Sequence, residues 1–272
     1  DYNLKGVMPV GRRIAVIGGG NAAVDVARTV LRLGAESVTV LYRRTREEMP
    51  AWEEEVNSAI EEGVRFEFLV YPKAITCAEG KVTGLTCGRM ELGEFDRSGR
   101  RRPREMAGTE FHLETDQVIP AVGQRLDAEA MTGGLPLKLR RDGFIEADPV
   151  TGQTSVEWVF AGGDAAAGPG SVILAVAAGE RAAVGIDRFL TGADHAFWRD
   201  HRAVNTAFDP ESDPVSYKRA EILTLPVNKR KSTFNQVELT WNETTAIREA
   251  RRCLRCDYRE AGPSEKGATT HA

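Results

Sequence analysis

The sequence has few cysteines, no strong excess of one charge and no long apolar run. Its 272 residues include four cysteines, and 36 Lys and Arg stand against 40 Asp and Glu, for a net charge of -4. Four cysteines do not make a disulfide framework, and this charge balance gives no overall positive field for nucleic acid. The most apolar run, Val172 to Ala178, is far shorter than the roughly 20 residues that a membrane span requires. These absences exclude a disulfide-stapled secreted domain, a charge-driven nucleic-acid binder and a membrane span.

The sequence also lacks a secretion signal and a histidine metal site. Its first residues, DYNLKGVMPVGRR, have no apolar stretch of the kind found at the centre of a signal peptide. His195 and His201 are six residues apart, and His112 and His271 stand alone, so no metal-ligand spacing is present. We therefore expect a cytoplasmic protein with structural or solvated histidines. Because the chain does not begin with Met and enters a strand pattern at residue 12, we also expect a fragment of a longer protein.

What is present is an alternation of strands and helices. Residues 12–17 and 38–42 are short, apolar and rich in β-branched residues, which predicts buried strands. Between them, Asn21 to Gly34 carries apolar residues at spacings of three and four, which predicts a helix. A second helix over 51–62 and a third strand over 64–70 continue the alternation. The pattern predicts an α/β fold built on a βαβ unit with parallel strands.

The rest of the chain is more varied. Residues 74–119 are typical of β-hairpins, interrupted by a basic polar segment over 94–104 that we interpret as a solvated loop rather than a docking patch. Further elements are predicted as strands over 118–122 and 158–161, a long small-residue helix over 171–190 and a short helix over 244–255. The tail is otherwise irregular, and its last residues, 262–272, are expected to be disordered.

The first strand runs into a glycine-rich loop of the GxGxxA pattern. Gly18 permits a tight turn, Gly20 lets the backbone approach a pyrophosphate, and small Ala23 lets the helix pack closely on the strand. The helix that begins at Asn21 offers unpaired N–H groups and the positive end of its dipole. The loop therefore predicts a dinucleotide site. The alternative is a tight turn that binds no dinucleotide.

The end of the second predicted strand carries arginines where most NAD sites carry an acidic residue. Arg43 and Arg44 are followed by Arg46, with Glu47 and Glu48 close enough to neutralise them in part. Guanidinium groups bind a 2′-phosphate through charge-assisted hydrogen bonds, each worth roughly 1.5–3 kcal/mol. This pattern favours NADPH over NADH. The alternative is that these are surface arginines without a ligand.

Taken together, these residues resemble a known family. The segment VIGGGNAAVDVARTVLRLGAESVTVLYRRTREEMPAW is similar to the NADPH domain of the glutamate synthase small subunit and its relatives, which are flavoproteins of the pyridine nucleotide-disulfide oxidoreductase group. The similarity continues in VIPAVGQ and in VFAGGDAAAGPGSVILAVAAGERAA. The resemblance implies a Rossmann-like NADPH-binding domain with a β-hairpin extension over 1–117, the C-terminal half of an FAD-binding domain over 118–192, and an extended tail over 193–272.

The resemblance also implies which residues contact FAD. The segment containing Gly123 would cross back into the FAD domain, and Gly163 and Asp164 match a motif whose Asp bonds the ribityl chain. The helix that begins near Ser171 and Val172 would direct its positive end toward the flavin, where it stabilises the anionic reduced ring. The alternative for Asp164 is a turn or helix-capping role. The family's first FAD motif and its N-terminal cysteine-rich cluster segment are absent from the sequence, which fits a truncated chain that binds FAD poorly or not at all on its own.

Cys253 and Cys256 form a CxxC in EARRCLRCD. Two such thiolates can share one metal or cluster edge, but a complete site needs four ligands. The phrase resembles the start of the family's cluster-binding segment, without the further cysteines that follow there. Half of an iron–sulfur site completed elsewhere, a redox dithiol and unliganded thiols all remain open. Cys77 and Cys87 are ten residues apart, so they do not form the CxxC of thioredoxin reductases.

The preferred interpretation is an NADPH-dependent FAD oxidoreductase like the glutamate synthase small subunit. Hydride would pass from NADPH to FAD, and electrons would then pass to iron–sulfur clusters and to a larger partner subunit. No side-chain acid or base is required, because the cofactors carry the chemistry. One alternative is the electron-transfer subunit of a ferredoxin:NADP oxidoreductase, formate dehydrogenase or hydrogenase complex. A second is a non-catalytic adaptor that keeps the fold.

Overall fold

The computed structural model describes residues 8–95, 99–195 and 215–252, and the chain divides into two compact units. Of the described residues, 8–95, 99–123 and 215–252 form the first unit, and 124–195 form the second. None of the described helices has the length and apolar character needed to cross a membrane.

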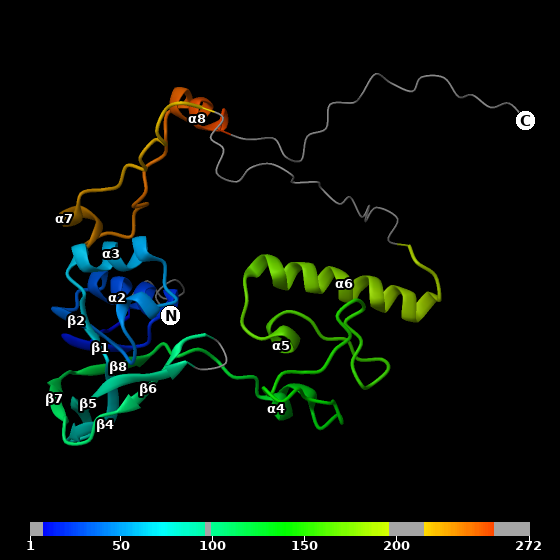
Figure 1. Cartoon of the computed structure of the whole chain (residues 1–272), viewed down its shortest axis with the longest axis horizontal. Helices are drawn as coiled ribbons and strands as arrows, with labels where there is room; N and C mark the ends of the chain where they lie inside the picture. The colour runs from blue at the N-terminus through cyan, green and yellow to red at the C-terminus, as the bar shows by residue number, and fades with distance from the viewer. Residues whose placement is uncertain (1–7, 96–98, 196–214, 253–272) are drawn as a thin grey trace, which may run out of the picture. The chain divides into compact units, whose positions relative to one another are not determined.

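A four-stranded parallel sheet forms the centre of the first unit (Figure 1). Its strand order is β3-β2-β1-β8, and the strands are β1 (Arg13–Ile17), β2 (Ser37–Tyr42), β3 (Arg65–Phe68) and β8 (Gln117–Pro120). Within β1, Ile14 and Val16 pack toward one cluster of buried residues and Ala15 toward another. This alternation buries both faces of the sheet, as expected for parallel strands.

Two helices cover one face of this sheet. They are α2 (Asn21–Arg32) and α3 (Glu53–Glu62), and a short 3₁₀ helix, η1 (Arg46–Glu48), precedes α3. The apolar residues of α2 recur on one side of the helix, where Ala23, Ala27 and Val30 are buried against the sheet. The βαβ unit and both helices predicted from the sequence are therefore confirmed.

An antiparallel sheet packs against the other face. It consists of β4 (Val70–Ala78), β5 (Lys81–Phe95), β6 (Arg101–Glu105) and β7 (Phe111–Glu114), with the order β4-β5-β6 and β7 also paired with β5. The strand predicted over 64–70 is divided at Leu69, whose φ of +54° turns the chain from the parallel sheet into the antiparallel one. The predicted loop over 94–104 was too long, since Arg101–Glu105 pairs with β5 and forms a hairpin with it.

The boundary between the two compact units lies after Gly123. The cofactor-domain boundary predicted at 117 stays a prediction. Val118 pairs with Ala15 and Ile119 with Val16, so β8 is an edge strand of the first sheet. The described tail residues, 215–252, belong to the first unit as well. Their helices are α7 (Val227–Arg230) and α8 (Glu243–Ala250), of which α7 packs on α3.

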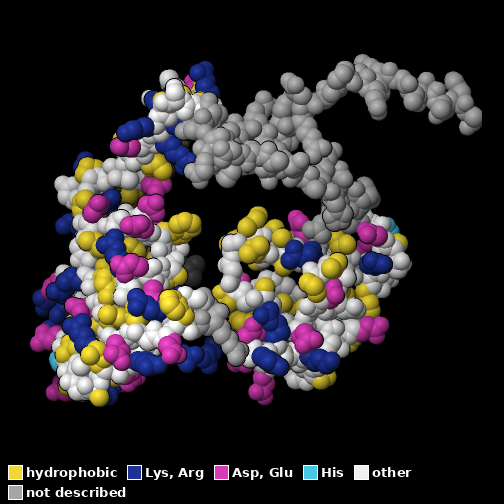
Figure 2. All heavy atoms as spheres, viewed as in Figure 1, with side chains coloured by type: hydrophobic (Ala, Val, Ile, Leu, Met, Phe, Trp, Pro, Cys, Tyr) yellow, Lys and Arg dark blue, Asp and Glu magenta, His cyan; other side chains and the backbone are white. Residues whose placement is uncertain are grey.

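The second unit has little regular structure besides its helices. These are α4 (Ala128–Thr132), α5 (Asp164–Ala167) and the 20-residue α6 (Val172–Thr191). The long helix is confirmed, but the strand predicted over 158–161 is wrong, because Phe160 forms only an isolated bridge with Gln153 in the described residues. A strand needs a partner along its length to satisfy its backbone groups. Hydrophobic side chains of α6 lie exposed on the surface (Figure 2).

Candidate functional site

The glycine loop between β1 and α2 is held tightly at its first two residues. Gly18 has a φ of +150°, and a Cβ there would lie 2.3 Å from the carbonyl oxygen of Ala121. A Cβ at Gly19 would lie 2.3 Å from the ring of Tyr42. The Gly18 amide also donates to the Leu41 carbonyl oxygen at 3.0 Å. The ends of β2 and β8 therefore leave no room for a side chain at either position.

The third glycine is in a different environment. Gly20 has a φ of -90° and a ψ of 174°, and a Cβ there would meet no described atom within 4 Å. Gly20 is the N-cap of α2, no side chain among the described residues caps this helix, and its first turn carries no acidic residue. Backbone N–H groups and the positive end of the helix dipole are thus open to an anion. This arrangement fits the pyrophosphate of a dinucleotide.

The start of α3 is tied to the glycine loop. The Trp52 amide donates to Oδ1 of Asn21 at 2.9 Å, and the Ala51 amide donates to the Gly19 carbonyl oxygen at 3.2 Å. Asn21, predicted to bind the cofactor, therefore also positions the segment that leads into α3. The sequence analysis missed this contact, since nothing local in the sequence relates residues separated by about thirty positions.

The predicted pair of arginines at the end of β2 is divided between two environments. Arg43 is exposed, whereas Arg44 is 4% exposed and donates from Nε to the carbonyl oxygen of Arg101 at 2.8 Å. Successive side chains at a strand end point in opposite directions, which explains the difference. Arg46 is exposed, and its guanidinium contacts the side-chain oxygen of Asn57. The surface presented to solvent therefore carries Arg43 and Arg46, with Arg44 beneath it.

Two glutamates follow these arginines. The Oε1 atom of Glu48 accepts from the Arg101 amide at 3.1 Å, and its Oε2 accepts from the Thr45 hydroxyl at 3.3 Å. The pKa of Glu47 is held below its usual value by hydrogen bonds from its own backbone amide and from the side chain of Thr45. Glu47 is therefore charged at neutral pH, and the Glu48 carboxylate is engaged by hydrogen bonds from the chain itself.

The predicted FAD residues of the second unit surround one cavity of about 490 Å³. Gly163, Asp164, Ser171 and Val172 line it together with small residues of α6. Gly163 has a φ of +58°, and Ser171 is the N-cap of α6, where its Oγ accepts from the Leu174 amide at 3.4 Å. Val172 is 81% exposed. The start of α6 is thus held in place and its first turn is open, which fits the polar edge of a flavin.

Asp164 has a structural partner within this cavity. Its Oδ1 accepts from the Gly170 amide at 3.3 Å, across the turn that joins α5 to α6. This is the turn role weighed as an alternative, and contact with FAD stays a prediction. Gly123 has a φ of +93°, and a Cβ there would meet no described atom within 4 Å. Glycine is favoured at Gly123 by the backbone conformation alone.

The cysteines offer no complete metal site among the described residues. Cys253 and Cys256 lie outside them. Cys77 is exposed and Cys87 is buried, and burial raises the pKa of the Cys87 thiol to about 11. In the described part of the chain, no three His, Cys, Asp or Glu side chains are grouped to hold a metal ion. The iron–sulfur hypothesis therefore rests on the CxxC sequence alone.

Comparisons with known proteins cover most of the chain. Residues 2–179 match the model of the pyridine nucleotide-disulphide oxidoreductase family. The chain is 45% identical over 258 residues to the NADP(+)-dependent formate dehydrogenase subunit beta of Moorella thermoacetica, a match that covers 90% of this chain and 36% of that relative. It is 42% identical over 184 residues to the glutamate synthase (NADPH) small chain of Escherichia coli K12, covering 66% of this chain and 39% of the relative. The chain thus spans well under half the length of these relatives.

Solved structures show the same fold. The thioredoxin reductase of Lactococcus lactis superimposes with a TM-score of 0.55 at 23% identity, over 71% of this chain and 57% of that one. This likeness confirms the α/β fold class. The family match and the named relatives agree with the resemblance carried by the sequence motifs.

Proposed function

The chain belongs to the pyridine nucleotide-disulphide oxidoreductase family, and from this we propose that it is the NADPH-binding part of a flavin oxidoreductase together with part of its FAD site. When bound, NADPH supplies a hydride and FAD accepts it. The chain's own residues bind and orient the two cofactors.

The observation that carries this proposal is the open N-terminus of α2. Gly18 and Gly19 fix the loop against β2 and β8, while Gly20 leaves space in front of the helix. The first-turn N–H groups would hold the pyrophosphate, and the exposed guanidinium of Arg43 would bind the 2′-phosphate. The same residues support NADPH rather than NADH, since a 2′-phosphate is the group that arginines at this strand end would recognise.

In the second unit, the proposed ligand is the flavin half of FAD. The cavity beside Gly163 and Asp164 is lined by small residues, so a planar ring system can approach the backbone closely. The positive end of α6 at Val172 would stabilise negative charge on the reduced ring. Asp164 would bond the ribityl chain in addition to its contact with Gly170.

The final acceptor is proposed to lie in a larger partner subunit of a cytoplasmic enzyme. Both named relatives are described as subunits or chains of larger enzymes. The glutamate synthase small chain matches 66% of this chain, whereas the formate dehydrogenase subunit beta matches 90%. The longer match favours, as a second candidate, an electron-transfer subunit of the formate dehydrogenase kind. In either case Cys253 and Cys256 are proposed ligands of an iron–sulfur cluster completed outside this chain.

Substitution of Gly20 tests the nucleotide site. Because Gly20 has an ordinary backbone conformation and open space beside it, Gly20→Val is expected to fold normally while its branched side chain fills the space for the pyrophosphate. Isothermal titration should then show loss of both NADPH and NADH at an unchanged melting temperature. The wild type should prefer NADPH. Equal affinity of Gly20→Val and wild type for NADPH, or no binding of NADPH by the wild type, would contradict the proposal.

A further inference from the structure

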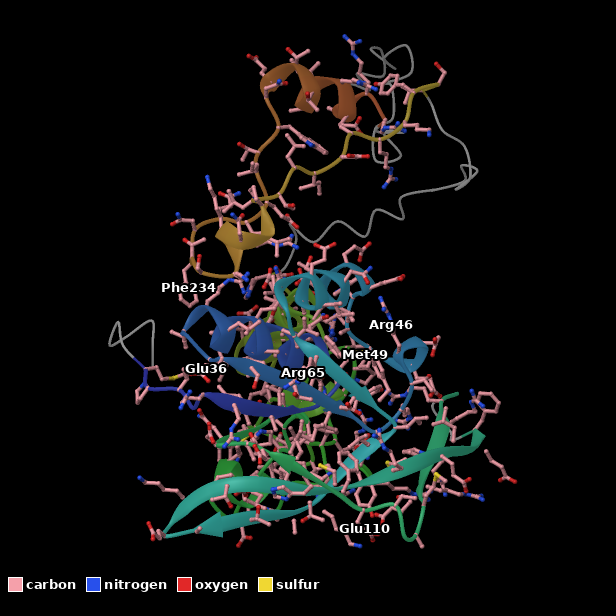
Figure 3. All side chains as sticks on the ribbon, turned by 90° about the vertical axis from the view of Figure 1, so that its left-hand side faces the viewer. Glu36, Arg46, Met49, Arg65, Glu110 and Phe234 are labelled. Atoms are coloured by element: carbon pink, nitrogen blue, oxygen red, sulfur yellow. The ribbon has the colours of Figure 1, made fainter. Side chains whose placement is uncertain are left out.

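The β5–β6 hairpin reaches the arginine loop that follows β2. Arg44 donates from Nε to the carbonyl oxygen of Arg101 at 2.8 Å, and the Arg101 amide donates to Oε1 of Glu48 at 3.1 Å. Two backbone groups of one hairpin residue are therefore bonded to two side chains of the loop. In Figure 3, Arg46 and Met49 lie at η1, on the side where the ends of β5 and β6 approach it.

A cavity of about 730 Å³ lies between the loop and the hairpin. The loop contributes Met49 and Pro50, and the hairpin contributes Phe95, Arg100 and Arg101. This volume is within the range of about 300–1,000 Å³ that is typical of small-ligand sites. The combination of apolar walls and guanidinium groups suits a ligand with a flat aromatic part and an anionic part.

The aromatic wall is a single exposed ring. Phe95 is 74% exposed at the end of β5, where it pairs with Arg101 of β6. A large aromatic side chain left exposed beside a cavity is a stacking surface for a heteroaromatic base. Purine rings stack on such a ring largely regardless of their substituents.

The arginines of the hairpin favour an anionic group on the ligand. Arg100 and Arg101 line the cavity, while Arg104 crosses Gly93 on the neighbouring strand, where a Cβ would lie 2.8 Å from its Nε. Glu47 and Glu48 also line the cavity. Glu48 already accepts hydrogen bonds from Thr45 and from the Arg101 amide, so its negative charge is partly compensated.

We propose that this cavity holds the adenosine 2′-phosphate end of NADPH, with Phe95 against the adenine and with Arg100 and Arg101 binding the 2′-phosphate. The inference rests on the proposed function, because it assumes that the chain binds NADPH. It adds a specificity element that lies more than fifty residues along the chain from Arg43.

Binding of two small probes tests the inference. The first, 2′,5′-ADP, carries the 2′-phosphate, and the second, 5′-AMP, lacks only that group. Arg100→Ala combined with Arg101→Ala keeps the backbone hydrogen bonds of Arg101 and removes two charges. We expect titration calorimetry to show about ten-fold weaker binding of 2′,5′-ADP, with 5′-AMP binding changed by less than about two-fold.

Two further variants complete the test. Arg102→Ala, on the same strand but outside the cavity lining, removes a charge and should leave 2′,5′-ADP binding nearly unchanged. Phe95→Ala should weaken both probes by a similar factor, because stacking does not depend on the 2′-phosphate. Melting temperatures of all variants should match that of the wild type.

The outcomes separate the inference from the proposed function. If the wild type binds no 2′,5′-ADP, the proposed function fails. If it binds 2′,5′-ADP, loses that binding in Arg43→Ala and keeps it in the double hairpin variant, the hairpin inference alone is overturned. An equal loss in Arg102→Ala would likewise overturn it, because a general positive field would then account for the effect.

Discussion

Three consecutive glycines in this chain meet three different physical requirements. Gly18 is fixed by its backbone conformation and by the carbonyl oxygen of Ala121, and Gly19 is fixed by the ring of Tyr42. Gly20 meets no such requirement from the described protein atoms, and its contact with a ligand stays a prediction. The GxGxxA pattern predicted the tight turn at Gly18, whereas its prediction of a pyrophosphate beside Gly20 has no test in the structure. The packing of Gly19 on Tyr42 could not be found from spacing alone.

Gly18→Ala is expected to destabilise the chain by about 2 kcal/mol or more, because the added Cβ overlaps a backbone oxygen that cannot move away easily. Gly20→Ala serves as the matched control and should leave the free energy of unfolding nearly unchanged. Urea denaturation of both variants measures the difference. Equal stability of the two would show that the loop near Ala121 can relax.

The buried thiol of Cys87 gives a pH prediction. Burial raises its pKa to about 11 from an ordinary value of 9.0. The folded state therefore holds the proton more tightly than the unfolded state, so this contribution to stability is present below pH 9 and is lost as the pH rises toward 11. At pH 8 a thiol reagent should modify exposed Cys77 and leave Cys87 unmodified.

Mass spectrometry after labelling of the folded chain at pH 8 checks the reactivity, and urea denaturation between pH 8 and 10.5 checks the stability. In Cys87→Ala, the fall in stability over this pH range should be smaller than in the wild type. Equal labelling of Cys77 and Cys87 in the folded chain would contradict the burial on which the prediction depends.

At the level of elements, the pattern of apolar residues predicted the strands and helices that pack against their neighbours in the sequence. The apolar run within residues 12–17 and the three- and four-residue spacing in α2 locate β1 and its helix because the two pack on each other locally. The strand over 101–105 was missed because its arginines are typical of a solvent-exposed loop. The strand forms through hydrogen-bonded pairing with β5 rather than through burial of its side chains. The strand predicted over 158–161 does not form, since an apolar run specifies burial but not a partner.

Contact between α7 and α3 depends on a cluster of charged side chains. The buried carboxylate of Glu62 accepts from Arg28 at 2.8 Å and from Arg32 at 3.0 Å, and Nε of Arg230 lies 3.4 Å from it. Arg230 also pairs with Glu61. Because Arg28 and Arg32 remain, loss of Arg230 would leave Glu62 compensated while releasing the tail from α3.

Arg230→Ala is therefore expected to destabilise the packing of residues 215–252 by about 1–3 kcal/mol and to leave the parallel sheet intact. Hydrogen exchange should increase in α7, with little change in α2. Arg12→Ala removes an exposed pair with Glu36 and is a suitable control, for which no measurable change is expected. Unchanged exchange in α7 would show that other contacts hold the tail.

On the scale of the whole molecule, the two units differ in how much apolar surface they bury. Both clusters of buried core residues lie in the first unit, around β1 and β2. In the second unit, Ile145 is the one described large hydrophobic residue that is buried, while Ile173 and Leu174 of α6 are more than half exposed. Burial of apolar area is the main favourable term in folding, so the second unit gains less stabilisation from burial than the first unit does.

Thermal unfolding of this chain is accordingly expected to show two transitions, with the second unit melting first. Hydrogen exchange at a temperature between the transitions should be complete over residues 124–195 and slow in β1 and β2. Addition of NADPH should raise the later transition, because ligand binding stabilises the unit that holds it. A single cooperative transition with uniform exchange would contradict the assignment of separate stabilities.

The hydrogen bonds between Arg44, Glu48 and Arg101 have a consequence for exchanging cofactor preference by design. Residues 43–50 could be replaced by the matching segment of an NADH-using relative. The side chains of that segment would fit the relative's hairpin and not this one. The carbonyl oxygen of Arg101 would lose the hydrogen bond from Arg44. The arginines of the hairpin would remain in the recipient protein. The loop over 43–50 and the β5–β6 hairpin would have to be transplanted together. Nucleotide preference would then be exchanged through two segments that are distant in the sequence rather than through one loop.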